Sequence, residues 1–148
     1  MMVQPDAVSN REQVVDTMIG LTRLTSLHRA IVAGSGSMEL YLALRRRGFL
    51  RAATVATCRT AKGQHPIGLV AGHNSLRAIE AALVQLSPFL GASAAVAVLI
   101  DSREIGAGLR IRGKLEQMGF RIEAGVRCPQ GLVLSAIRHG FGQMEMAA

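Results

Sequence analysis

The spacing of apolar residues along the chain predicts four helices. The clearest begins after Ser75, a candidate N-cap, where leucine and isoleucine recur every three or four positions as far as Leu90. A helical repeat of apolar residues also predicts an N-terminal helix over residues 9–26. The other two helices are predicted over about residues 37–47 and 107–118, because each pattern is followed by a glycine, which is typical of a helix end.

Shorter apolar runs predict six strands. Four of these runs are apolar or rich in Val and Thr, which is typical of strands buried on both faces: residues 28–33, 51–58, 67–72 and 94–100. Residues 120–127 alternate apolar and polar side chains, so this strand is predicted to lie half-exposed at an edge. Residues 132–138 are apolar on both faces and should be interior. The turn at 128–131 is so short that these last two strands must be antiparallel.

The order of these elements indicates an α/β fold. Strands that alternate with helices typically build a parallel sheet with helices on both faces. The loop at 60–66 is too short for a parallel return, so strands 51–58 and 67–72 are predicted not to pair directly. We predict a three-layer α/β domain over residues 27–139, with a mostly parallel six-stranded sheet and a C-terminal antiparallel hairpin. The flanking segments are predicted to be tails: residues 1–8, expected to be disordered, and residues 140–148.

Composition narrows the class of protein. A chain of 148 residues with 49% hydrophobic residues can bury a sizeable core, and this apolarity favours a further interface between subunits. We therefore expect a homo-oligomer, in the simplest case a dimer. The longest apolar run, residues 94–100, is far shorter than the roughly 20 residues that span a bilayer, so no membrane partner is expected. The N-terminal residues lack the pattern of a signal peptide, which predicts a cytoplasmic location.

Charge and cysteine content point to no specific chemistry. The net charge of +7 permits an acidic partner, but aromatic residues make up 3% and the basic residues cluster only at Arg45–Arg47. Stacking on bases needs basic and aromatic residues interleaved, so nucleic acid is the least supported partner class. We predict that Arg45–Arg47 form a solvated helix end. Cys58 and Cys128 lie far apart without a cluster of other ligands, which predicts two buried thiols and no metal site.

Three stretches in chain order resemble a known fold. Residues 31–49, IVAGSGSMELYLALRRRGF, form a predicted strand, Gly-x-Gly turn and helix. Residues 67–100 continue with strand, helix and strand, and residues 109–138 with a helix and two strands. This order resembles the fold of S-adenosylmethionine-dependent methyltransferases. The resemblance implies that the last strand inserts beside strand 94–100 and leaves strand 120–127 at the edge.

The chain also departs from that family's pattern. After the second strand the family normally has a helix, a third strand and another helix, where this chain has only the short loop at 60–66. No acidic residue stands in VATCRT, residues 55–60, where the family holds the cofactor ribose, and Gly68 replaces the common acidic residue of the fourth strand. The resemblance therefore implies a shortened, methyltransferase-like domain without the third-strand region and without the usual acidic cofactor anchors.

The turn Gly34-Ser35-Gly36-Ser37 is the main candidate binding site. Glycines let a backbone turn tightly and approach a ligand, and the N–H groups at a helix start can receive one. The resemblance implies that S-adenosylmethionine binds here. The alternative is a purely structural turn between a strand and a helix. Glu39, in the first helical turn, is predicted to stabilise the helix dipole.

Residues at neighbouring strand ends are predicted to complete the site, because ligands of open α/β sheets lie at carboxyl ends of strands. Thr57 and Gly72 are predicted to line the cofactor pocket. His73 and Asn74 are the candidate catalytic residues, His73 as a base and Asn74 as an orienting amide. The alternative is that Asn74 and Ser75 cap the following helix. Four polar residues after strand 94–100 are predicted to cap a helix, with substrate contact as the alternative: Asp101, Ser102, Arg103 and Glu104.

Two functions follow from these residues. In the first, a small methyltransferase-like domain binds S-adenosylmethionine or a related nucleoside at Gly34–Ser37. An active protein would be an S-adenosylmethionine-dependent methyltransferase, but the missing acidic anchors argue against catalysis. In the alternative, the chain is a non-catalytic, oligomeric interaction or regulatory protein derived from the same fold. Loss of the third strand would make strand 51–58 an edge, which a second copy or the helix at 9–26 would then cover.

Overall fold

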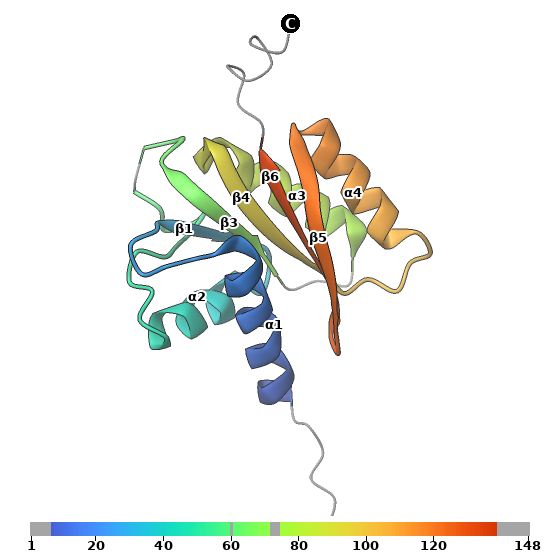
Figure 1. Cartoon of the computed structure of the whole chain (residues 1–148), viewed down its shortest axis with the longest axis horizontal. Coiled ribbons are helices and arrows are strands. Elements are labelled where there is room, and N and C mark those ends of the chain that lie inside the picture. The colour runs from blue at the N-terminus through green and yellow to red at the C-terminus, as the bar shows by residue number, and fades with distance from the viewer. Residues whose placement is uncertain (1–6, 60, 72–74, 139–148) are drawn as a thin grey trace, which may run out of the picture.

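The computed structural model describes residues 7–59, 61–71 and 75–138. Its strands are β1 (Ala30–Ala33), β2 (Ala53–Thr54), β3 (His65–Val70), β4 (Leu90–Ile100), β5 (Phe120–Cys128) and β6 (Gly131–Arg138). They form one six-stranded sheet in the order β2-β1-β3-β4-β6-β5, shown in Figure 1. Strands β2, β1, β3 and β4 run parallel, and the β5–β6 hairpin joins β4 in antiparallel pairing.

Within the described ranges, helices cover the sheet in two pairs (Figure 1): α1 (Ala7–Thr22), α2 (Ser37–Arg46), α3 (Leu76–Leu86) and α4 (Ala107–Gln117). Side chains of α1 and α2 share one buried core with one face of the sheet, and those of α3 and α4 share a second core with the other face. Strand β1 contributes side chains to both cores, because alternate residues of a strand point to opposite faces. Ile31 and Ala33 pack in the core on the α3 side, and Ala30 and Val32 pack in the core on the α1 side.

The predicted fold class is confirmed. The chain has a three-layer α/β architecture with a mostly parallel sheet, and β6 lies between β4 and β5 as the polarity pattern indicated. Strand β5 is half-exposed at the edge, and burial alternates from Phe120 to Gly125, whereas Val126, predicted to face inward, is exposed. The strands on either side of the short loop do not pair, because β1 lies between β2 and β3.

The predicted strand over 51–58 is wrong in length. Only Ala53 and Thr54 pair with β1, although the N–H of Val55 still donates to the carbonyl of Val32 at 3.0 Å. The reason is local. The N–H of Thr57 donates to both the carbonyl and the hydroxyl of Thr54, at 3.1 and 3.2 Å, and this closes a turn that ends the strand.

Other boundaries also differ from the predictions. The N-terminal helix spans Ala7–Thr22 rather than 9–26, β1 begins at Ala30 rather than at residue 28, and β3 ends at Val70 rather than at residue 72. The loop predicted at 60–66 is shorter, because His65 and Pro66 already belong to β3. The helix predicted to reach Leu90 ends at Leu86, since Pro88 cannot continue the α-helical hydrogen bonds and a 3₁₀ turn follows over Ser87–Phe89. Strand β4 consequently begins at Leu90, four residues before the predicted start at residue 94.

Two side-chain predictions are corrected as well. Arg45 and Arg46 are exposed, as a solvated helix end requires, but Arg47 is half-buried and forms ion pairs with Glu12 and Asp16 of α1. Arg47 therefore clamps α1 to the end of α2. The two cysteines are partly exposed rather than fully buried.

Candidate functional site

The Gly34–Ser37 turn joins β1 to α2 and is fixed against the end of β3. Gly34 has φ of +103°, and a Cβ atom at this position would lie 2.3 Å from the carbonyl oxygen of Ala71. That same oxygen accepts a hydrogen bond from the N–H of Gly36 at 3.2 Å, and the N–H of Ser37 donates to the carbonyl of Gly34 at 3.1 Å. Only glycine fits at position 34, so the turn lies directly against Ala71.

This turn lies where the strand order reverses. Helix α2 follows β1 on one face of the sheet and α3 follows β3 on the other, as Figure 1 shows, so the two connections diverge at the carboxyl ends of adjacent strands. In open α/β sheets this is the usual ligand position. Gly72, His73 and Asn74, predicted to complete the site, lie outside the described residues. Ser75 caps α3 as predicted, with its hydroxyl accepting from the N–H of Ala78 at 3.3 Å.

After β2, the chain carries Thr57 rather than a carboxylate to the carboxyl ends of the strands, where the turn also lies. The Thr57 hydroxyl is within hydrogen-bonding distance of the Thr54 hydroxyl, at 2.8 Å, and the Thr57 residue is exposed. Gly68, which stands where the family commonly has an acidic residue, has a packing role in this structure. It lies in the middle of β3, where a Cβ would come within 2.7 Å of Leu86 and 2.9 Å of Leu90, so this glycine allows close packing of α3 and not ligand binding.

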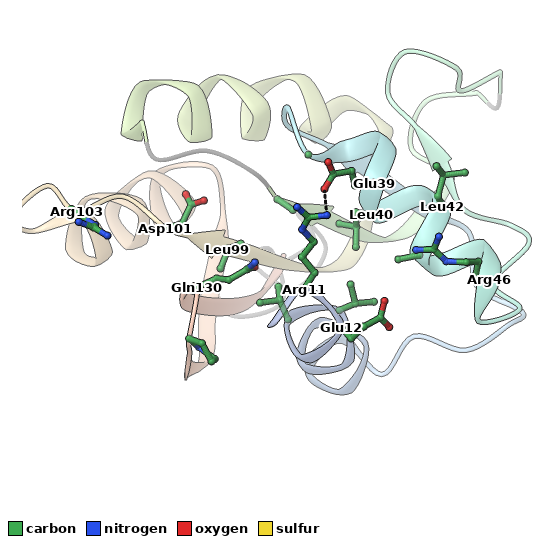
Figure 2. Close-up of a pocket in the computed structure, with 16 residues that line it drawn as sticks. Arg11, Glu12, Glu39, Leu40, Leu42, Arg46, Leu99, Asp101, Arg103 and Gln130 are labelled. Carbon is green, nitrogen blue, oxygen red and sulfur yellow. Dashed lines mark ion pairs between the residues drawn. The ribbon is translucent and has the colours of Figure 1, made fainter. Parts of the chain in front are cut away.

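A cavity of about 940 Å³ opens beside the turn, and Figure 2 shows its lining. It shares Gly36 with the predicted turn, and Ala71 from the end of β3 also lines it. The rest of the lining comes from α1, from the side of α2 that faces α1, from the end of β4 and from the β5–β6 turn. Thr57 is not part of this lining. The cavity therefore extends from the turn away from β2.

Charged residues of both signs line this cavity. Arg11 of α1 reaches across it toward Glu39 of α2, and their ion pair measures 3.5 Å (Figure 2). Both side chains are more than half exposed, so this pair contributes at most about 1 kcal/mol to stability. Asp101, at the end of β4, also faces the cavity, and its Oδ1 atom is buried.

The polar residues 101–104, which follow β4, have two different roles. Glu104 caps α3 rather than the helix that follows it in sequence, because its carboxylate accepts from the N–H of Leu76 at 3.3 Å and from the Ser102 hydroxyl at 3.2 Å. Helix α4 instead begins at Gly106, in the left-handed conformation. Asp101 and Arg103 line the cavity, which leaves them as the members of this segment that a ligand in the cavity would meet.

A second polar cluster, which the sequence patterns did not indicate, lies on the α3 side. The imidazole of His65 is 1% exposed, with Nδ1 3.2 Å from the carbonyl of Phe89 and Nε2 3.8 Å from the thiol of Cys58. A carbonyl can only accept, so Nδ1 carries the proton and Nε2 accepts from the thiol. Burial lowers the pKa of His65, Arg29 lowers it further, and the hydrogen bond to Phe89 partly opposes both.

Other site chemistries find no support. Among the described residues, no three His, Cys, Asp or Glu side chains gather closely enough to hold a metal ion. The helices within the described ranges are all too short or too polar to cross a membrane. The part of the site that sequence reasoning missed is the contribution of α1. Its apolar positions predicted a core helix correctly, but nothing local placed Arg11 beside Glu39.

No protein-family model and no curated protein sequence matches this chain. Solved structures match it by fold. A SAM dependent methyltransferase from Aquifex aeolicus superposes with a TM-score of 0.62 at 12% identity, over 85% of this chain and 88% of that one. Precorrin-6y C5,15-methyltransferase from Geobacter metallireducens gives 0.59 at 10% identity, over 86% and 88%. Magnesium protoporphyrin IX methyltransferase from Synechocystis, with bound SAM, gives 0.55 at 14% identity, over 93% and 86%. The chain therefore has the fold of SAM-dependent methyltransferases.

Proposed function

We propose that this chain binds S-adenosylmethionine or a related nucleoside at the Gly34–Ser37 turn. The observation that carries the proposal is the position of this turn. It lies at the carboxyl ends of β1 and β3, where the strand order reverses, and it opens through Gly36 on a cavity of about 940 Å³. The neighbour from Synechocystis, which has the same fold, was solved with bound SAM.

The residues present fit such a ligand in part. Gly36 brings backbone without a side chain to the cavity, and the first turn of α2 has no side-chain cap at that residue. Thr57 lies outside the lining of the cavity, so its hydroxyl would meet only a ribose that extends from the turn toward β2. Gly72 belongs to the proposed binding set with Ser35 and Ser37. A ribose diol would find no carboxylate at the end of β2, so we expect weaker binding than a site with an acidic anchor provides.

The proposal concerns binding and leaves out methyl transfer. Bound S-adenosylmethionine would supply an electrophilic methyl group, and the chain would then have to position an acceptor and take up its proton. His73 and Asn74 stay the predicted candidates for that work. The alternative of a non-catalytic interaction protein rested partly on pairing at an exposed edge strand. That argument is weaker here, because β2 is only two residues long and short edge strands discourage pairing. A homo-oligomer stays a prediction, which the mass in solution at micromolar concentration would test.

Calorimetry with S-adenosylhomocysteine and S-adenosylmethionine tests the proposal. Gly36 has φ of −87°, a negative value that residues with side chains also adopt, so we expect Gly36→Val to fold and to block the approach of a ligand, and its circular dichroism spectrum checks the fold. Gly113→Val, in α4 on the opposite face, is the matched control, since nothing lies near its Cβ position. We expect binding to wild type and to Gly113→Val, and at least tenfold weaker binding to Gly36→Val. No heat at millimolar ligand would contradict the proposal, and equal binding to both variants would move the site elsewhere.

A further inference from the structure

The cavity between α1 and α2 carries a charge pattern that nucleoside binding does not require. Its floor is apolar and buried, with Val14 and Val15 from α1, Leu40 and Ala43 from α2, and Leu99 from β4 each no more than 5% exposed. Its rim holds three arginines and three acidic residues. The balance between these charges depends on which of them are already paired within the protein.

All three acidic residues of the rim already have partners. Glu39 pairs with Arg11, Glu12 pairs with Arg47 outside the cavity, and Asp101 also has an interaction partner. Two arginines differ from these. Within the described residues, Arg46 and Arg103 have no ion pair and no side-chain hydrogen bond, and both are exposed.

These two arginines lie at opposite ends of the lining, as Figure 2 shows. Arg46 stands near the end of α2, and Arg103 follows the end of β4. The cavity therefore combines an apolar floor with a positive charge at each end that forms no ion pair with any described residue. Ligand sites typically have this composition, with a mostly apolar lining and a few charged groups that select the ligand.

We infer that this cavity binds a small apolar acid, whose hydrophobic body lies on the floor between α1 and α2 and whose acidic group pairs with Arg46 or Arg103. Charge complementarity is the argument. A neutral apolar molecule would leave both guanidinium groups without a counter-charge, and a cation would be repelled by both. The inference does not depend on nucleoside binding at the Gly34–Ser37 turn, and each can fail without the other.

Two fluorescent probes of nearly the same shape test it. 1-Anilinonaphthalene-8-sulfonate is an apolar anion, and N-phenyl-1-naphthylamine is the same molecule without its sulfonate. On the folded wild-type chain we expect the anion to bind about tenfold more tightly than the neutral probe. The double variant Arg46→Gln/Arg103→Gln should lose this preference while its affinity for the neutral probe stays unchanged. Each single variant then shows which end holds the sulfonate.

The control must remove the same charge elsewhere. Arg45→Gln/Arg112→Gln lowers the net charge equally, and both residues are exposed and outside the lining. This control should keep the wild-type preference for the anion. Equal weakening in the two double variants would overturn the inference, because the anion would then respond only to overall charge. Equal affinity of wild type for the two probes would overturn it as well.

A second pair of variants tests the inference with both arginines left in place. Leu42 is 47% exposed and lines the cavity four residues before Arg46, so Leu42→Glu would place a carboxylate beside that guanidinium on the helix surface. Leu109 of α4 is 74% exposed on the other face, and Leu109→Glu is its control. We expect the anion to bind about tenfold more weakly to Leu42→Glu and normally to Leu109→Glu. Normal binding to Leu42→Glu together with normal binding to Arg103→Gln would contradict the inference, because neither end of the lining would then hold the anion.

Discussion

The two ends of the sheet are held together by different means. At one end, β5 and β6 form a long antiparallel hairpin, and six consecutive residues of β6 also pair with β4. At the other end, β2 contributes two residues, and the chain then returns to β3 without a helix (Figure 1). That return is held by single contacts, such as the N–H of Gly63 donating to the carbonyl of Pro88 at 3.0 Å and the buried His65.

This difference predicts that the two ends depend differently on individual residues. A ladder of backbone hydrogen bonds tolerates most substitutions, because the pairing uses groups that every residue except proline carries. Gly131, where the hairpin turns, is the exception, because a Cβ there would lie 2.3 Å from the carbonyl oxygen of Ile100. An end held by a few specific side chains and by close contacts between backbone atoms is destabilised when one of these residues changes. The candidate binding turn belongs to this second kind, since Gly34 and Ala71 meet at the β1–β3 boundary.

The largest effect is expected for Gly34→Ala. The alanine would have to adopt a left-handed φ, and its Cβ atom would lie 2.3 Å from the Ala71 carbonyl oxygen. We expect a loss of about 3 kcal/mol or more in the free energy of unfolding, measured by urea denaturation. Gly48→Ala is the matched control, with φ of +91° but open space around its Cβ position, and should cost only about 1 kcal/mol. Equal costs would show that the contact with Ala71 imposes no constraint.

The hairpin end could be predicted almost residue by residue. Its alternation of apolar and polar residues, and the short turn before Gly131, are local signals that the environment of an edge strand preserves. Gly48 and Gly119 likewise marked helix ends, and both have the left-handed φ of that position. The strand order followed from polarity together with the resemblance.

The β2 end could be predicted only in outline. The patterns showed that the strands flanking the loop at 60–66 do not pair, but not that Thr54 ends β2 or that His65 begins β3. These boundaries depend on contacts with Thr57, with Cys58 and with Phe89, which is 24 residues further along the chain. The cavity escaped prediction for the same reason, since its wall comes from five segments that are far apart in the sequence.

The next largest effect is expected for His65→Gln, which tests how much one buried side chain stabilises the weakly paired end. The substitution disturbs the contacts to Phe89 and Cys58 in a buried position, so we expect a loss of about 2 kcal/mol at pH 8. The cost should shrink in acid. Because the pKa of His65 is lowered in the folded protein, the unfolded chain takes up the proton first.

The stability that the neutral imidazole provides is therefore complete above its ordinary pKa of 6.5 and is lost as the pH falls below that value. The glutamine variant has no such group to titrate. Denaturation curves at pH 8 and pH 5.5 should show wild type and variant closer together at the lower pH. Curves that fall in parallel would mean that His65 is not the source of the acid sensitivity. The charged and titratable groups near this imidazole are Arg29 and Cys58.

The smallest effect is expected for Arg138→Gln, at the end of β6. Its guanidinium donates to the carbonyls of Leu90 and Ser87 and lies 4.9 Å from the ring centroid of Phe120. Because the hairpin ladder persists without these contacts, we expect a loss of only about 1 kcal/mol in the free energy of unfolding. Arg127→Gln, on the exposed part of β5, should cost almost nothing. If Arg138→Gln lowered the free energy of unfolding more than His65→Gln does, the proposed difference between the two ends would be wrong, since the hairpin end would then also depend on a single side chain.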